Sequence, residues 1–429
     1  MNIQSIKIQN FRGFESFEAE LHPQLTVVVG NNGVGKSSFL DALSISVGTF
    51  FSGLDGVTCP GIHKDDVTCK SFEMGSVIDL QPQYPSVIES RGEISGEDIY
   101  WARVLYSSNG RTRFVDAKSI IAVAERYQKQ IRSGSTETIL PIISYYGTGR
   151  LWAQKKEKRA SEELVKFSRL NGYLDCLAAE SNEKLMLKWF EKMTIQQAQR
   201  AMPSPELTAV KQAISKCFAN ITEASDVDTQ FNLDTHSLDI VYTDKSGNKI
   251  RSPMKNLSDG YKNTLGLIAD IAYRMAVLNP QLLDDVLAKT PGIVLIDEID
   301  LHLHPKWQQR IIKDLQSIFP CVQFVVSTHA PSVISSVKKE NLIILKEDGV
   351  AYVQAAEIYG KDANTILTGV MDVEHRPSEI QREFDQFYKL VDTGDFEKAS
   401  DIIDALEHTI GAEDPELVKA RVTLALEGF

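Results

Sequence analysis

Cysteine is scarce in this sequence of 429 residues. Its five cysteines are scattered and none is spaced as C-x-x-C, so we expect neither a disulfide framework nor a structural zinc site. Long apolar runs are also missing, because no stretch approaches the roughly 18 uncharged apolar residues of a membrane span. Residues 1–8 begin at once as a strand pattern, without the basic segment and cleavage site of a secretory signal. These absences predict a cytoplasmic protein without a membrane partner.

Basic residues are not in excess. The 46 Lys and Arg against 58 Asp and Glu give a formal net charge of −12. This balance argues against a protein that coats nucleic acid by bulk attraction, although it is compatible with a local basic groove. A solvated helix face is the simpler interpretation of the strongest basic run. That run comprises Arg150, Lys155, Lys156, Lys158 and Arg159.

The most informative segment is residues 30–37, which fit the phosphate-binding loop G-x-x-x-x-G-K-[ST]. An apolar run precedes it and a helical pattern follows, which is the context that the motif requires. Its glycines let backbone N–H groups turn towards phosphate oxygens, and the helix N-terminus adds positive partial charge. We expect Lys36 to reach the β- and γ-phosphates of ATP and Ser37 to bind Mg²⁺. The expected nucleotide contacts are Gly30, Asn31, Asn32, Gly33, Val34, Gly35, Lys36, Ser37 and Ser38.

A second motif combines an apolar strand, residues 292–296, with the acids Asp297 and Glu298. Such a run predicts a buried parallel strand whose carboxylates lie at its C-terminal edge. Asp297 would hold Mg²⁺, directly or through water. Glu298 would polarise the water that attacks the γ-phosphate. A third apolar strand, residues 322–326, ends in Ser327, Thr328 and His329, and we expect His329 to sense the γ-phosphate beside Glu298.

Residues 256–262 (NLSDGYK) lead into an apolar helix. Ser258 is placed to cap this helix, and the amides behind it form an anion site. Many helices begin in this way. The signal is nevertheless strong here, because the segment lies between the phosphate loop and the acidic strand in the sequence.

The order of these motifs resembles the ABC-type ATPase heads of the SMC/RecF group. The resemblance implies an α/β P-loop fold in which two heads sandwich two ATP molecules. Ser258 and Gly260 would then contact the γ-phosphate of the other subunit, and Asp300 would begin the D-loop, residues 300–305. Arg12, within the segment NFRGF, would lie near the nucleotide.

Two departures from that family pattern stand out. Asp259 and Tyr261 replace the Gly and Gln of the transporter signature, which disfavours a transporter subunit. No Q-loop is evident, and Gln81 and Gln83 are the candidates. His302 and His304 in the D-loop suggest a metal site, but packing and hydrogen bonding at a subunit interface are the favoured interpretation.

The segments YYGTGRLW (145–152), DLHLHP (300–305) and STHAP (327–331) narrow the resemblance to bacterial ATPases related to PtuA, the ATPase of the Septu anti-phage system. That resemblance implies a homodimer or higher homo-oligomer that controls a partner HNH nuclease of the PtuB type. The alternative is a RecF-like DNA-repair ATPase that binds DNA directly. No D-x-D pair follows His329, so we do not expect the chain to be a Toprim nuclease itself.

The motifs divide the chain into an ABC-type ATPase core and two additions. Residues 1–48 and 254–355 form the expected core. Residues 49–253 are expected to be a long inserted lid of mixed α and β structure with a helical part. Residues 356–429 are expected to be helical and to dock a partner, with His375 ahead of the helices as either a partner contact or a turn residue.

Overall fold

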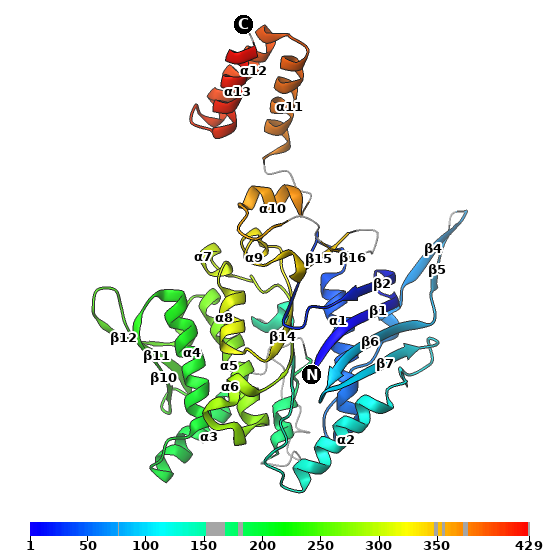
Figure 1. Ribbon diagram of the computed structural model, residues 1–429, viewed down its shortest axis with the longest axis vertical. Coiled ribbons are helices and arrows are strands. Elements are labelled where there is room, and N and C mark those ends of the chain that lie inside the picture. The colour runs from blue at the N-terminus through cyan, green and yellow to red at the C-terminus, as the bar shows by residue number, and fades with distance from the viewer. Residues whose placement is uncertain are drawn as a thin grey trace. The chain divides into compact units, whose positions relative to one another are not determined.

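The computed structural model describes residues 1–75, 77–151, 168–178, 183–346, 351–353, 357–371 and 376–427. It divides into two compact units, residues 1–361 and 362–429, which are described separately (Figure 1). All five cysteines are free thiols. Within the described ranges, no helix has both the length and the apolar character needed to cross a membrane. Several residues named above lie outside the described residues: Trp152, Lys155, Lys156, Lys158, Arg159 and His375.

A six-stranded sheet in the order β16-β15-β3-β14-β13-β9 lies at the centre of the first unit. Its strands run parallel except β16, which pairs antiparallel at one edge. Continuous apolar runs suit parallel strands that are covered on both faces. Because parallel strands end at the same edge of a sheet, the residues after β3, β9, β13 and β14 gather there. The strands are β3 (Leu25–Val29), β9 (Ile142–Tyr146), β13 (Gly292–Ile296), β14 (Val322–Ser327), β15 (Leu342–Leu345) and β16 (Ala351–Val353).

Helix α1 (Lys36–Val47) packs between this sheet and a second, antiparallel sheet (Figure 1). The antiparallel sheet has the order β2-β1-β6-β7-β8. Trp101 of β7 is fully buried and donates from Nε1 to the carbonyl oxygen of Ser46 at 3.0 Å, which fixes α1 on this sheet. The strands are β1 (Asn2–Phe11), β2 (Phe14–Glu20), β6 (Ser86–Ile94), β7 (Glu97–Leu105) and β8 (Arg113–Val115).

Residues 49–253 are more integrated than an insertion, which corrects the expected division of the core. Strands β6, β7 and β8 extend the sheet begun by β1, and β9 is an edge strand of the central sheet. These pairings join strands far apart in the chain, so local sequence patterns could not reveal them. The rest of the segment includes α2 (Lys118–Arg132), which packs against β7, and a separate hairpin of β4 (Cys69–Met74) and β5 (Val77–Pro82).

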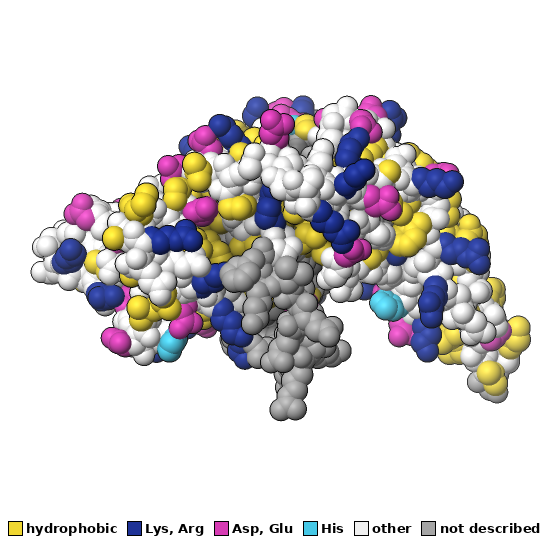
Figure 2. All heavy atoms as spheres, turned by 90° about the horizontal axis from the view of Figure 1, so that it is seen from below, with side chains coloured by type: hydrophobic (Ala, Val, Ile, Leu, Met, Phe, Trp, Pro, Cys, Tyr) yellow, Lys and Arg dark blue, Asp and Glu magenta, His cyan; other side chains and the backbone are white. Residues whose placement is uncertain are grey.

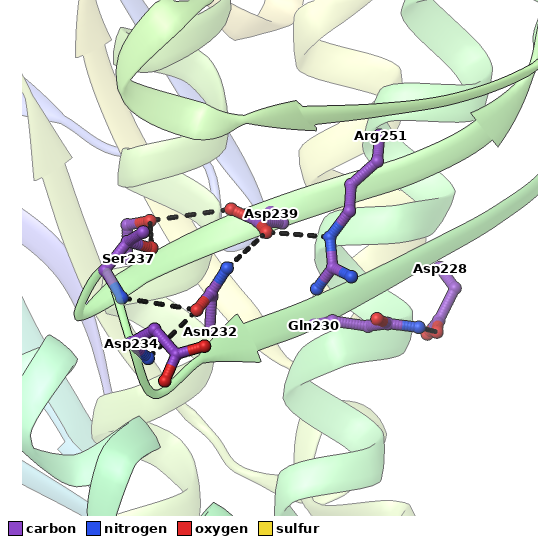
Figure 3. A network of polar contacts seen from close by, with 8 residues as sticks. Asp228, Gln230, Asn232, Asp234, Ser237, Asp239 and Arg251 are labelled. Carbon is purple, nitrogen blue, oxygen red and sulfur yellow. Dashed lines mark hydrogen bonds and ion pairs between the residues drawn. The ribbon is translucent and has the colours of Figure 1, made fainter.

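A three-stranded sheet, β10-β11-β12, follows two helices in the second half of the segment. Asp239 of β11 is its buried centre and accepts hydrogen bonds from Arg251 at 2.8 Å and Asn232 at 3.2 Å (Figure 3). These contacts join all three strands. The elements are α3 (Glu183–Arg200), α4 (Pro205–Thr222), β10 (Ser225–Asn232), β11 (Ser237–Thr243) and β12 (Lys249–Pro253).

The chain then returns to the central sheet through α5 (Asp259–Leu278). Helix α5 packs against β9 and α4, and shorter helices connect the last strands. These are α6 (Val286–Lys289), α7 (Pro305–Gln308), α8 (Ile311–Ile318) and α9 (Pro331–Ile334).

The second unit is helical and begins at residue 362 rather than at the expected 356. Apolar residues at helical spacing, among them Phe384, Phe387 and Ile403, form its buried core. Its predicted helices are confirmed. They are α10 (Ala363–Gly369), α11 (Ser378–Asp392), α12 (Phe396–Ile410) and α13 (Pro415–Glu427).

Candidate nucleotide-binding site

The phosphate loop joins the end of β3 to the start of α1, as its motif predicts. Gly35 has a φ of 104° and a Cβ there would lie 2.8 Å from the Phe14 ring, so a larger residue does not fit. The Lys36 ammonium donates to the carbonyl oxygens of Gly30 and Asn31, both at 2.9 Å. Burial lowers the pKa of Lys36, and the carboxylates of the acidic strand oppose that effect. The ammonium thus lies folded over the loop where phosphate oxygens are expected.

Four polar groups form a continuous chain at the ends of β13 and β14. The Ser37 hydroxyl donates to Asp297 Oδ2 at 2.6 Å. Ser327 donates to Asp297 Oδ1 at 2.5 Å and accepts from the backbone N–H of Glu298 at 2.8 Å. Asp297 is only 3% exposed, while Glu298 is half-buried with a φ of 48°, which is unusual for a residue other than glycine. Hydroxyl and carboxylate oxygens in this arrangement suit Mg²⁺.

His329 follows the neighbouring strand and is half-buried. Burial lowers its pKa, the charge of Lys36 lowers it further, and Asp300 and Asp297 oppose both effects. The lowered pKa favours the neutral imidazole. Thr328 Oγ1 donates to Asp300 Oδ1 at 2.5 Å, which ties the start of the D-loop to β14. The structure thus brings Lys36, Asp297, Glu298, Asp300 and His329 to one edge of the sheet.

The signature segment packs on the D-loop of its own chain. Gly260 is buried, and a Cβ there would lie 2.5 Å from the carbonyl oxygen of His302. Asn263 Nδ2 donates to the carbonyl oxygen of Leu301 at 2.9 Å, one turn further along α5. Ser258 takes the N-cap position of α5, but its side chain makes no cap hydrogen bond and it is exposed. Its hydroxyl therefore faces outwards.

The D-loop histidines do not form a metal cluster. His304 caps α7, because its Nδ1 accepts from the backbone N–H of Lys306 at 3.2 Å. No group of three or more His, Cys, Asp or Glu side chains in the described part of the chain is arranged for a metal ion.

Arg12 directly follows β1 and is bound by two carboxylates of its own chain. Its guanidinium forms ion pairs with Asp41 of α1 and, at 2.9 Å, with Asp66. Burial acts to lower the pKa of Arg12, but the two carboxylates outweigh it and raise that pKa. Arg12 is therefore fastened to the helix that follows the phosphate loop.

The Q-loop candidates lie in or next to the β4–β5 hairpin. Gln81 Nε2 donates to the carboxylate of Asp79 at 2.9 Å, and Gln83 Nε2 donates to the carbonyl oxygen of Gln81 at 2.8 Å. The side chains of both glutamines are hydrogen-bonded to groups within or beside the β4–β5 hairpin.

Two site residues escaped the sequence analysis. Ser327 was noted only as the end of its strand, although it contacts both acidic residues. Tyr145 of β9 is buried; burial raises the pKa of its hydroxyl, as do Asp41, with which it shares a hydrogen bond, and Asp297. The available signal is the tyrosine pair at the end of the apolar stretch 139–146, but it becomes meaningful only once β9 is known to lie beside β13.

Comparison with known proteins agrees with this geometry. Residues 5–222 match the family described as "AAA domain", and residues 124–334 match the "AAA ATPase domain" family. The chain belongs to the AAA ATPase family.

Relatives of this ATPase extend over its whole length. It is 24% identical to the "Retron Ec83 probable ATPase" of Escherichia coli, over 99% of this chain and 86% of that protein. It is 23% identical to the "Septu protein PtuA" of Bacillus thuringiensis, over 98% of this chain and 97% of that protein. A solved SMC head domain from Thermotoga maritima matches with a TM-score of 0.45 and 17% identity, over 83% of this chain and all of that one. The resemblance to PtuA-related ATPases is confirmed by the sequence comparisons.

Proposed function

We propose that this AAA ATPase hydrolyses ATP in a Mg²⁺-dependent reaction at the edge of the central sheet. The observation that carries the proposal is the hydrogen-bonded chain Ser37–Asp297–Ser327–Glu298 beside Lys36. A phosphate loop alone would bind a nucleotide. A second acidic residue placed one position after the metal-binding acid adds a base for attack by water.

Each residue has a distinct part in this proposal. Lys36 exchanges the carbonyl oxygens of its own loop for phosphate oxygens and neutralises their charge. Ser37 and Asp297 supply oxygen ligands for Mg²⁺, which would polarise the phosphates when bound. Glu298 orients the attacking water, and the neutral His329 donates a hydrogen bond towards the γ-phosphate. Ser327 holds Asp297 and Glu298 in register.

We further propose that two chains share each nucleotide. Ser258 is exposed at the start of the 20-residue helix α5, with its hydroxyl not used as a cap. The amides at that helix start carry positive partial charge that suits a phosphate of a second chain. Ser258, Gly260 and Asp300 would then complete the pocket of the partner, and turnover would require a homodimer or a larger homo-oligomer.

Mixing two inactive variants tests the shared site directly. Lys36→Ala damages the phosphate loop and Ser258→Arg damages the signature. In a mixed dimer, one composite site carries both defects and the other carries none, so mixing should restore ATP hydrolysis. If each chain forms its own complete site, the mixture stays as inactive as its components.

Glu298→Gln tests the chemistry. We expect the variant to bind ATP, to lose hydrolysis and to accumulate as a dimer with ATP in sedimentation analysis. Glu340→Gln, an exposed acid elsewhere, is the matched control. Wild-type turnover in Glu298→Gln would contradict the proposed role of Glu298.

The biological role that we propose is the ATPase subunit of a cytoplasmic anti-phage defence complex that controls a partner HNH nuclease of the PtuB type. The support is the similarity to Septu PtuA and to a retron ATPase over nearly the whole chain, including the helical second unit. We propose that this unit docks the nuclease and that the chain is not itself a nuclease. Co-purification of a nuclease encoded beside this gene tests the proposal. Salt-dependent DNA binding by the purified chain, with no such nuclease, would favour the RecF-like alternative instead.

A further inference from the structure

A pocket of about 320 Å³ lies in the first unit, apart from the phosphate loop. It is bounded on one side by residues 61–64 and on the other by the turn between β7 and β8. His63, Lys64 and Arg111 line it, and its described lining contains no Asp or Glu. Its volume is within the roughly 300–1,000 Å³ of ligand sites. The pocket is therefore large enough for a small ligand and is lined by cationic side chains.

A buried guanidinium behind the pocket wall strengthens its positive character. Arg103 of β7 is 3% exposed, and its Nε is buried without a hydrogen-bond partner. Its other nitrogens donate to Cys59 Sγ at 3.0 Å and to the carbonyl oxygen of Pro60 at 2.9 Å. No carboxylate among the described residues pairs with it, in contrast to buried Arg274, which pairs with Asp270 at 2.7 Å.

A buried guanidinium whose contacts are with neutral groups keeps a positive field that a bound anion can offset. Gly61 of the pocket lining lies beside Arg103, because a Cβ at this glycine would lie 3.5 Å from Arg103 Nη2 and 2.9 Å from Thr112 Oγ1. The wall is thus thin at the point where the charge lies. The observations together describe a site prepared for an anion.

An exposed aromatic ring beside Arg103 indicates which class of anion the pocket would bind. Phe114 of β8 is directly opposite Arg103 in the sheet register, and the Arg103 guanidinium lies 4.3 Å from its ring centroid. Phe114 is 44% exposed, and Thr112, two residues earlier in the chain, lines the pocket. Cationic groups beside an aromatic ring with a free face are the usual means of binding a nucleotide phosphate together with its base.

We propose that this pocket is a second nucleotide-phosphate site, distinct from the ATPase site. Lys64 and Arg111 contact the phosphate, Arg103 supplies buried positive charge, and Phe114 stacks on the base. The described pocket residues share none with the phosphate loop, β13 or β14. The phosphate belongs either to a free mononucleotide or to a single DNA strand. On the face shown in Figure 2, the described basic residues are interspersed with acidic and apolar side chains. They therefore form no continuous basic surface on that face that would compete with the pocket for a phosphate.

The test uses the full chain with Lys36→Ala, so that binding at the phosphate loop does not contribute. The probes are a fluorescent ten-nucleotide thymidine strand and fluorescent AMP, each followed by anisotropy. Lys64→Ala with Arg111→Ala should weaken binding of whichever probe occupies the pocket by roughly tenfold or more. Lys70→Ala with Arg126→Ala removes the same charge from residues that pair with Glu15 and Glu97, and it should leave binding unchanged.

The two probes distinguish the source of the phosphate. Binding of the strand that AMP does not displace identifies nucleic acid as the ligand, whereas binding of AMP itself identifies a free nucleotide. If neither probe binds, or if both double variants lose binding equally, the proposal is wrong. Phe114→Leu gives a further check, because loss of stacking should weaken either probe without any change in charge.

Discussion

Gly260 of the signature segment lies against the carbonyl oxygen of His302 in the D-loop, so closely that a Cβ would be 2.5 Å from it. The contact joins two motifs that lie about 40 residues apart in the sequence and that are both proposed to face a second chain. Because the signature segment and the D-loop are in contact, a shift of one must displace the other. The start of α5 and the D-loop therefore form one surface rather than two independent loops.

Gly260→Ala should separate these two motifs. The new methyl group must displace the D-loop backbone, and a shift of about 1 Å near a reacting centre can lower turnover about 100-fold. We expect ATP hydrolysis to fall by that order while the fold, followed by circular dichroism, is retained. Gly266→Ala is the control on the same helix, because among the described residues outside that helix's own backbone the nearest atom to its new Cβ is Met254 Cε at 3.9 Å. Equal activity in both variants would show that the contact has no functional importance.

Ser327→Ala should weaken catalysis more than nucleotide binding. The hydroxyl contacts both the Asp297 carboxylate and the Glu298 backbone, so its loss frees the two acids from each other. Removal of such supporting hydrogen bonds typically lowers activity about 10- to 100-fold. ATP turnover and ATP affinity should be measured separately. Ser335→Ala, which removes a hydroxyl bonded only to the carbonyl oxygen of Ser332, is the control. A change in affinity alone would contradict the positioning role.

The sequence predicted the strands that approach the nucleotide more successfully than the strands that surround them. Residues 25–29 and 292–296 are continuous apolar runs, and burial of a parallel strand on both faces leaves such a run little alternative. The pairing of β1 with the rest of the fold depends instead on contacts such as Gln323, whose side chain bonds both the N–H and the carbonyl oxygen of Ile3. Those residues are 320 positions apart, and no local pattern encodes their pairing.

Long-range strand pairing also explains which residues of the candidate site could be predicted from the sequence and which could not. Lys36, Asp297 and Glu298 belong to motifs with fixed spacing, so their chemistry is readable from the sequence. Tyr145 and Ser327 acquire roles only through strand order, which places β9 and β14 on either side of β13. The two glutamines considered for the Q-loop show that residue type alone is a weak signal. Gln81 and Gln83 were chosen by residue type alone, and their hairpin gives them partners of its own.

Arg12→Ala separates two possible roles of this residue. If the guanidinium also contacts the nucleotide, its loss should raise the ATP dissociation constant roughly tenfold, as expected for one charge-assisted hydrogen bond. Isothermal titration with a nonhydrolysable ATP analogue measures this effect. Arg91→Ala removes an exposed arginine that is 3.9 Å from its partner Asp98 and serves as the control. Unchanged affinity with reduced thermal stability would assign Arg12 to the Asp41 and Asp66 ion pairs alone.

Asp270→Ala should destabilise the first unit strongly. Its carboxylate accepts from Arg274 Nε and from the Tyr146 hydroxyl, both at 2.7 Å, and Arg274 is 5% exposed. Truncation leaves a buried guanidinium without its counter-charge, so we expect the free energy of unfolding to fall by about 3–5 kcal/mol.

Urea unfolding followed by tryptophan fluorescence measures that loss, and a matched variant isolates the effect of burial. Asp285→Ala breaks another i,i+4 ion pair, with Lys289, but both of those side chains are 60% exposed. Solvent already screens that pair, so its unfolding midpoint should be nearly unchanged. Tyr146→Phe should lie between the two, because it removes one hydrogen bond and leaves the ion pair intact. If Asp270→Ala and Asp285→Ala were equally stable, burial of the Asp270–Arg274 pair would have no effect on the stability of the first unit.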